Sequence, residues 1–197
     1  MSILLLAGSP SLNSRSSGLL KFIGNKLNLL GYSTKTVTIR DIPAEPLLHA
    51  NIKDESLSEA LNTVNVVDAI VLATPIYKAA YSGLLKVFLD VLPQNGLENK
   101  YILPVGSGGS AHHTLALDYG LRPVLTSLSA KNILPSIYAL DAHFQVDKDG
   151  AGATITDDLT ERINNGVERL HEHLLALQRN KSIHFNHIQF SNIKYSV

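Results

Sequence analysis

Short runs of apolar residues alternate along the chain with longer stretches in which apolar residues recur every three or four positions. The runs predict strands at 2–7, 34–39, 67–73, 101–107 and 132–138, the last interrupted by Pro135. The longer stretches predict helices at 19–30, from Ser56 onward, 83–92, 111–129 and from Thr156 to about 179. This alternation is typical of parallel βαβ units, so we expect one doubly wound α/β sheet of five parallel strands in the order 2-1-3-4-5, with helices on both faces.

Local signals refine this prediction at the ends of the elements. Residues 40–53 contain two prolines and are predicted to form a loop, whereas Ser56 and Glu59 fit a capping box. The polar segment 139–153 is predicted to be an excursion or hairpin, and Thr156 is the expected cap of the last helix. The helix at 83–92 is apolar on nearly every side, which indicates either a subunit interface or additional cover from the same chain.

Length and composition restrict the class of protein. The 197 residues suit one domain, expected over 1–178, followed by a polar tail at 179–197. Seventeen basic and seventeen acidic residues cancel, so nothing indicates binding to nucleic acid or to an anionic membrane. The chain has no cysteine, which excludes disulfides and thiolate chemistry, and the eight histidines show no metal-ligand spacing. We expect a cytoplasmic protein without a bound metal.

The connection after the first strand is crowded with hydroxyl groups around one arginine. It contains Ser9, Ser11, Asn13, Ser14, Arg15, Ser16 and Ser17. Free N–H groups at the start of a helix, serine hydroxyls and a guanidinium together favour a phosphate, although serine and asparagine also serve as ordinary caps. Because the nucleoside-triphosphate motif GxxxxGK[ST] and the dinucleotide motif GxGxxG are both missing, a phosphomonoester is the better candidate.

Two further connections follow strands that should end at the same edge of the sheet. Pro75 and Tyr77 offer a flat wall, and the small residues 106–110 allow a planar ligand to approach the backbone closely. A phosphate pocket beside a slot for a ring meets the needs of flavin mononucleotide (FMN).

Three segments carry a resemblance to a known family. GSPSLNSRSSGLL, ATPIYKAAYSGLLKVFLDVLP and LPVGSGGSAHHTLALDYGLRPVL resemble the NADPH-dependent FMN reductases of the flavodoxin-like superfamily, in particular those that partner alkanesulfonate monooxygenase. The resemblance covers about residues 1 to 145. It implies a flavodoxin-like fold and hydride transfer from NADPH, with NADH possible, to FMN. It also implies delivery of reduced flavin to a separate monooxygenase for alkanesulfonate desulfonation.

The resemblance also assigns residues to the cofactor. It implies phosphate contacts from Ser9, Ser14, Arg15 and Ser16, and a ring site formed by Thr74, Pro75, Ile76, Tyr77 and Lys78 on one side and Ser107, Gly108 and Gly109 on the other. Most family members have valine where this chain has Ile76. For Lys78, contact with FMN or NADPH and an exposed loop charge both remain open.

Two residues are candidates for a direct part in turnover. Pro123 lies four positions after Tyr119 in a predicted helix, so the carbonyl of Tyr119 loses its donor and the helix must kink or bulge. The family carries a tyrosine in a π-helix at a subunit interface near the flavin, which implies a homodimer or homotetramer and a role for Tyr119 in flavin exchange. His113 is a candidate for ligand or phosphate contact, and His112 and His113 alternatively belong only to the helix start.

Other enzymes share this expected architecture. A quinone or azo-dye reductase would keep FMN bound and reduce an organic acceptor, and an electron-transfer flavodoxin would be strongly acidic, unlike this chain.

Overall fold

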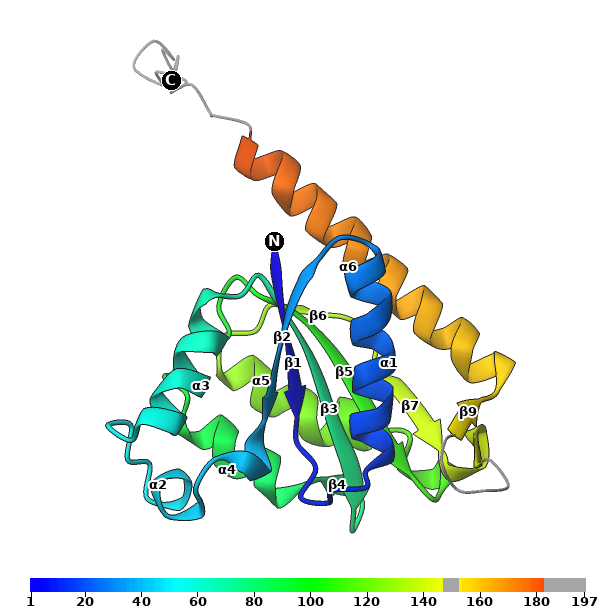
Figure 1. Ribbon diagram of the computed structural model, residues 1–197, viewed down its shortest axis with the longest axis horizontal. Coiled ribbons are helices and arrows are strands. Elements are labelled where there is room, and N and C mark those ends of the chain that lie inside the picture. The colour runs from blue at the N-terminus through cyan, green and yellow to red at the C-terminus, as the bar shows by residue number, and fades with distance from the viewer. Residues whose placement is uncertain (147–152, 183–197) are drawn as a thin grey trace, which may run out of the picture.

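One mainly parallel sheet forms the middle layer of the computed structural model, which describes residues 1–146 and 153–182 (Figure 1). Helices α1 and α6 cover one face, and α3, α4 and α5 cover the other. The elements in chain order are β1 (Ser2–Ala7), α1 (Arg15–Leu29), β2 (Ser33–Thr38), η1 (Ile39–Asp41), α2 (Ala44–Leu48), α3 (Glu55–Val66), β3 (Ala69–Tyr77), β4 (Ala80–Tyr81), α4 (Gly83–Val91), β5 (Tyr101–Gly108), η2 (Ala111–His113), η3 (Leu117–Leu121), α5 (Arg122–Ser127), β6 (Asn132–Ile133), β7 (Ile137–Leu140), η4 (Asp141–His143), β8 (Phe144–Val146), β9 (Ala153–Ile155) and α6 (Asp157–Ser182).

The expected α/β architecture with a parallel sheet is present, but its strand count is corrected. The main sheet has seven strands, ordered β2-β1-β3-β5-β6, with β4 paired to β3 and β7 paired to β5. The predicted five-stranded order 2-1-3-4-5 is therefore replaced by 2-1-3-5-6 in the seven-stranded numbering. Two causes account for the difference: residues 80–81 fold back antiparallel on β3, and Pro135, which has no N–H to donate, divides the last predicted strand into β6 and β7.

Alternate residues of the central strands enter two separate cores. In β1, Leu4 and Leu6 pack with α3 and α4, whereas Ile3, Leu5 and Ala7 pack with α1 and α6. A strand that is buried on both faces reads as a continuous apolar run, which explains why β1 was so clear in the sequence. The polar connections are consequently left to the ends of the strands, where the candidate site lies.

Several predicted boundaries differ from the structure. Residues 40–53, predicted as a loop, include the last two residues of η1 and all of α2. Helix α3 starts before the predicted cap Ser56, because the side chain of Asp54 accepts from Leu57 N at 3.0 Å. Thr156 precedes α6 as predicted, yet its buried hydroxyl makes no hydrogen bond. The hairpin predicted within 139–153 is formed by β8 and β9, and residues 147–152 lie outside the described residues.

The predicted helix at 111–129 is broken into three parts, one of which is a π-helix. The carbonyl of Leu117 accepts from Arg122 N, five residues later, and Tyr119 lies within this π-helix, η3. The alternatives of a proline kink and a bulge are therefore resolved in favour of the bulge. The guanidinium of Arg122 donates to the carbonyls of Ile133 and Leu134, both at 3.2 Å, where the edge strand is interrupted.

Helix α4 buries one face and leaves apolar residues on the other. Leu85, Phe88 and Leu89 are buried, whereas Leu84 and Val87 are half-buried. The proposed subunit interface at this helix stays a prediction. Helix α6 runs to Ser182, and residues 183–197 lie outside the described ones. The division into a domain at 1–178 and a tail at 179–197 therefore stays a prediction. Among the helices of the described residues, none is long and apolar enough to cross a membrane.

Candidate functional site

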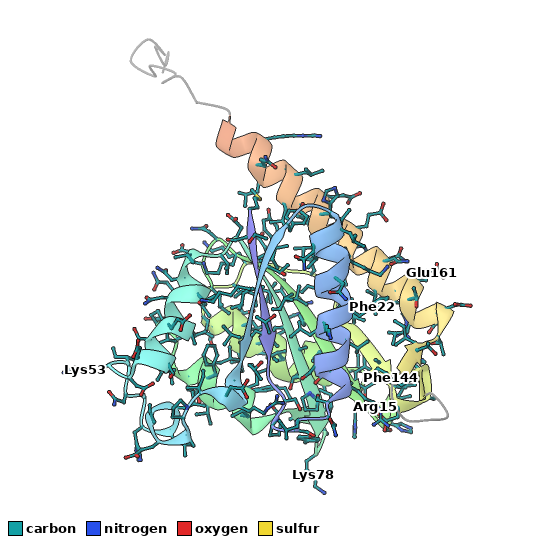
Figure 2. All side chains as sticks on the ribbon, in the orientation of Figure 1. Arg15, Phe22, Lys53, Lys78, Phe144 and Glu161 are labelled. Atoms are coloured by element: carbon teal, nitrogen blue, oxygen red, sulfur yellow. The ribbon has the colours of Figure 1, made fainter. Side chains whose placement is uncertain are left out.

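A cavity of about 1100 Å³ opens at the carboxyl ends of the central strands. This edge of an open α/β sheet is where ligands usually bind. Figure 2 shows Arg15 and Phe144 close together at the amino-terminal end of α1, which forms one wall. The lining residues are Ser11, Asn13, Ser14, Arg15, Gly18, Leu19, Lys21, Phe22, Asn25, Pro75, Ile76, Tyr77, Ser107, Gly108, Gly109, Asp141, Phe144, Thr154, Ile155 and Thr160.

The first loop is the connection from β1 to the start of α1, and its hydroxyl groups divide into two sets. Ser14 caps α1, accepting from Ser17 N at 3.4 Å, and its hydroxyl lies 2.8 Å from that of Ser16. The hydroxyl of Ser9 accepts from Ser11 N at 3.2 Å. Ser9 and Ser16 are buried and shape the loop, whereas Ser11, Asn13 and Ser14 line the cavity.

Arg15 lies on the cavity wall in contact with a carboxylate. Its guanidinium is 3.1 Å from Asp141 and 5.8 Å from the centre of the Phe144 ring. About half of each charged side chain is exposed, and such pairs contribute about 0–1 kcal/mol. A phosphate dianion can therefore compete with Asp141 for Arg15 at little cost.

The second loop comprises residues 74–83, and Thr74 holds it in place rather than facing the cavity. Its buried hydroxyl donates to the carbonyl of Pro75 at 3.1 Å and accepts from Ser82 N at 3.0 Å. Ser82 in turn caps α4 and donates to the carbonyl of Gly8. A Cβ atom at Gly8 would meet Leu85 Cβ at 3.0 Å, so glycine permits this close approach of the first loop to α4.

The second loop projects a tight hairpin between β3 and β4. Ile76 and Tyr77 line the cavity, whereas Lys78 is exposed at the tip and points away from the body of the protein (Figure 2). Lys78 and Ala79 have φ values of 50° and 64°, which corresponds to a type I′ turn without glycine. Each such residue stores about 1 kcal/mol or more of strain, which is typical of functional sites.

The third loop comprises residues 106–110, and its glycines expose the backbone to the cavity. A Cβ atom at Gly108 would lie 2.5 Å from the hydroxyl of Tyr138, which donates to the carbonyl of Ser110 at 2.9 Å. Burial raises the pKa of Tyr138, so this hydroxyl keeps its proton as a donor. Glycine at 108 is therefore required by the scaffold behind the cavity.

The two residues predicted to act in turnover lie elsewhere. Tyr119 is 78% exposed on the π-helix, and His113 ends η2, the short helix capped by Ser110. Neither lines the cavity of this chain. Within residues 1–146 and 153–182, no three His, Cys, Asp or Glu side chains are grouped so that they could hold a metal ion.

Sequence reasoning missed one side of the cavity. Asp141, Phe144 and the α1 residues Lys21 and Phe22 line it, although none was a candidate. Asp141 could have been found, because it directly follows β7 and so lies at the same edge of the sheet as the other loops. Phe144 lies in the segment predicted only as an excursion or hairpin.

Comparison with known proteins agrees with this geometry. Residues 1–145 match the family model of NADPH-dependent FMN reductase. The chain is 39% identical over 171 residues to an FMN reductase (NADPH) of Pseudomonas putida, covering 87% of each chain. It is likewise 39% identical to an FMN reductase (NADPH) of Escherichia coli strain K12, over 85% of this chain and 87% of the relative. The apo structure of an NADH:FMN oxidoreductase (EMOB) superposes with a TM-score of 0.77 at 36% identity, covering 85% of this chain and 87% of the other.

Proposed function

We propose, from the premise that the chain belongs to the NADPH-dependent FMN reductases, how its own residues carry out this reaction. The family uses FMN and NADPH, and the 39% identical relatives bear the name FMN reductase (NADPH). The observation that supports the residue assignment is the cavity, in which the hydroxyl-rich loop after β1 and the wall formed by Pro75, Ile76 and Tyr77 lie at the same edge of the sheet.

The donor set of the first loop fits the phosphate of FMN. Ser11, Asn13 and Ser14 line the cavity at the start of α1, where unpaired N–H groups and the helix dipole favour an anion. Arg15 supplies the positive charge by leaving its weak pair with Asp141. Ser9 and Ser16 act indirectly, because their buried side chains form hydrogen bonds that fix the shape of the loop.

The second and third loops fit a planar ring. Pro75, Ile76 and Tyr77 form one wall, and Ser107, Gly108 and Gly109 form the other. A flavin held here would supply the hydride-accepting centre, so the protein would supply position rather than acid–base chemistry. Thr74 keeps the wall in place through Pro75 and Ser82, and Lys78, exposed at the hairpin tip, is available to the phosphates of NADPH.

We assign Tyr119 and His113 to the cofactor site of a second copy of the chain rather than to the site of their own protomer. Both lie outside the cavity of their own protomer, and Tyr119 leaves 78% of its side chain exposed on an irregular helix. We infer that a homodimer or homotetramer covers Tyr119 and half-buried apolar residues of α4, and that Tyr119 controls the exchange of flavin. His113 contributes a ligand contact from the same surface.

The reduced flavin is proposed to serve a separate flavin-dependent monooxygenase that desulfonates alkanesulfonates. Three segments that resemble the reductases of such systems support this assignment. We place the enzyme in the cytoplasm, a reducing compartment that suits a chain without cysteine. Its catalytic domain is residues 1–178, followed by a tail at 179–197.

Steady-state turnover tests the proposal. We expect NADPH oxidation to saturate with free FMN added in excess over enzyme, and the mixture to support sulfite release by an alkanesulfonate monooxygenase. A yellow protein that stays idle with free FMN and turns over only with a quinone or azo compound would contradict it. Parallel assays with NADH determine the nucleotide preference.

A further inference from the structure

A second, smaller cavity lies between α1 and the edge strand β2. Its volume is about 380 Å³. It is lined by Leu5, Ala7, Ser17, Leu20, Lys21, Gly24, Asn25, Asn28, Thr34, Thr36, Thr38 and Arg40. Of these residues, Lys21 and Asn25 also line the larger cavity. The two cavities therefore lie on either side of the row of α1 residues that contains Lys21 and Asn25. None of the residues assigned to FMN borders the smaller one.

The strand face beneath α1 is polar where apolar packing would be ordinary. Because side chains alternate along a strand, Thr34, Thr36 and Thr38 share one face of β2, and all three line the cavity. The hydroxyl of Thr34 donates to Asn28 at 2.9 Å and closes one end of the cavity. These hydroxyls face α1 beside the apolar side chains of Leu5, Ala7 and Leu20, so the cavity is a chamber with both polar and apolar walls.

The charge of this chamber is positive. Lys21 and Arg40 line it, and no carboxylate of the described part of the chain does. Asp41 approaches the Nε of Arg40 to 3.3 Å without the alignment of a hydrogen bond, and Asp41 is itself largely exposed. The nearby pair of Lys35 and Glu59 belongs to the opposite face of β2, toward α3. An anion would therefore meet two cations in the chamber and no like charge on its walls.

Two buried polar atoms of residues that line the chamber have no hydrogen-bond partner among the described residues. They are the hydroxyl of Ser17 and the Nε of Arg40. Buried polar atoms in proteins are nearly always paired, and an unpaired one destabilises the fold. Each of these atoms can donate a hydrogen bond, and both belong to residues that line the chamber. Arg40 also donates to the carbonyl of Ser11, which connects this chamber to the loop that holds the FMN phosphate.

We propose that this chamber binds a phosphate group, free or carried by a phosphate monoester, near Lys21, Arg40, Ser17 and the threonines of β2. Its volume lies in the lower part of the range of about 300–1000 Å³ that is common for small-molecule sites, so it has room for a sugar attached to the phosphate. Two sources share this chemistry: free inorganic phosphate and the 2′-phosphate that distinguishes NADPH from NADH. The second source rests on the proposed function, whereas the site itself does not.

Direct binding to the full-length protein tests the site without turnover. Titration calorimetry is performed with 2′,5′-ADP, inorganic phosphate and adenosine, in the presence of excess FMN so that the first loop is occupied. We expect 2′,5′-ADP to bind and adenosine not to bind. The substitution Lys21→Gln should weaken binding about tenfold or more, because it removes a charge-assisted hydrogen bond. Lys35→Gln is the matched control, since it changes the net charge equally on the other face of β2.

The outcomes separate the site from its source and from the proposed function. Binding of inorganic phosphate that Lys21→Gln weakens, with an unchanged ratio of NADPH to NADH efficiency, supports the site with free phosphate as its ligand. A fall in that ratio for Lys21→Gln supports the NADPH source. The proposal is overturned if neither phosphate probe binds, or if Lys21→Gln and Lys35→Gln weaken binding equally. Wild-type FMN reduction is measured separately, so its failure would count against the proposed function alone.

Discussion

Replacing Thr74 by valine would test whether this residue positions the flavin wall or contacts the flavin. Valine keeps the shape of threonine but removes the hydroxyl that accepts from Ser82 N at 3.0 Å. Ser82 is 1% exposed, so water cannot replace the lost acceptor. A buried N–H without a partner destabilises the fold by about 1–3 kcal/mol, and about 1 kcal/mol lowers Tm by about 2–4 °C at this chain length.

A second buried threonine provides the control. The hydroxyl of Thr63 donates to the carbonyl of Glu59, four residues earlier in α3, and no group of the described residues donates to it in return. Thr63→Val leaves no N–H unpaired, so its cost should be about 1 kcal/mol or less. Urea unfolding of both variants at one protein concentration gives the difference in the free energy of unfolding.

Flavin binding completes the test. Thr74→Val should also weaken FMN binding, because the strand and hairpin that carry Ile76 and Tyr77 lose an anchor, and Thr74→Ser should restore both properties. Equal losses of stability in the Thr74→Val and Thr63→Val variants would refute the positioning role. So would a Thr74→Ser variant that fails to recover FMN affinity.

Three further predictions follow from the site and its scaffold. Arg15→Gln should weaken FMN binding about tenfold or more in a fluorescence titration while leaving the free energy of unfolding nearly unchanged, because the pair with Asp141 is half-exposed; unchanged FMN affinity would exclude the phosphate contact. Tyr119→Ala should retain FMN and lose turnover, and unchanged kinetics would remove its assigned role in flavin exchange. Burial lowers the pKa of Lys100 below 10.5, its value in the unfolded chain, so between the folded and the unfolded pKa the unfolded chain binds more protons at this group and the contribution of Lys100 to stability should rise with pH. Lys100→Met should flatten this rise in urea unfolding experiments, and an identical slope in both proteins would contradict the assignment.

The central strands and the loops at their carboxyl ends were predictable, because each depends on residues that are close in sequence. The apolar runs at β1, β3 and β5 identify strands buried on both faces, and Pro135 correctly indicates an interruption. The short strand β4 was not predictable in this way. It pairs with β3 through a turn in which Lys78 and Ala79 adopt positive φ without the glycine that normally signals such a turn.

The candidate site was predicted in part for a related reason. Eight of the twelve predicted cofactor residues line the cavity, whereas Ser9, Ser16, Thr74 and Lys78 do not. A pattern of hydroxyl groups shows which loop is polar, but it cannot show which hydroxyl faces inward to hold the loop. The wall formed by Asp141 and Phe144 depends on a contact with Arg15 across more than a hundred residues, which no local pattern encodes.

The π-helix and the interrupted edge strand are connected through Arg122. Arg122 reaches the carbonyls of Ile133 and Leu134 because η3 contains one more residue per hydrogen-bonded turn than an α-helix would. Deleting that extra residue would rotate Arg122 by about 100° around the helix axis, away from the two carbonyls beside Pro135. A related protein without the π-helix would lose the hydrogen bonds that Arg122 donates to the carbonyls of Ile133 and Leu134 at the edge of the sheet. We expect related sequences to keep or lose the two irregularities together.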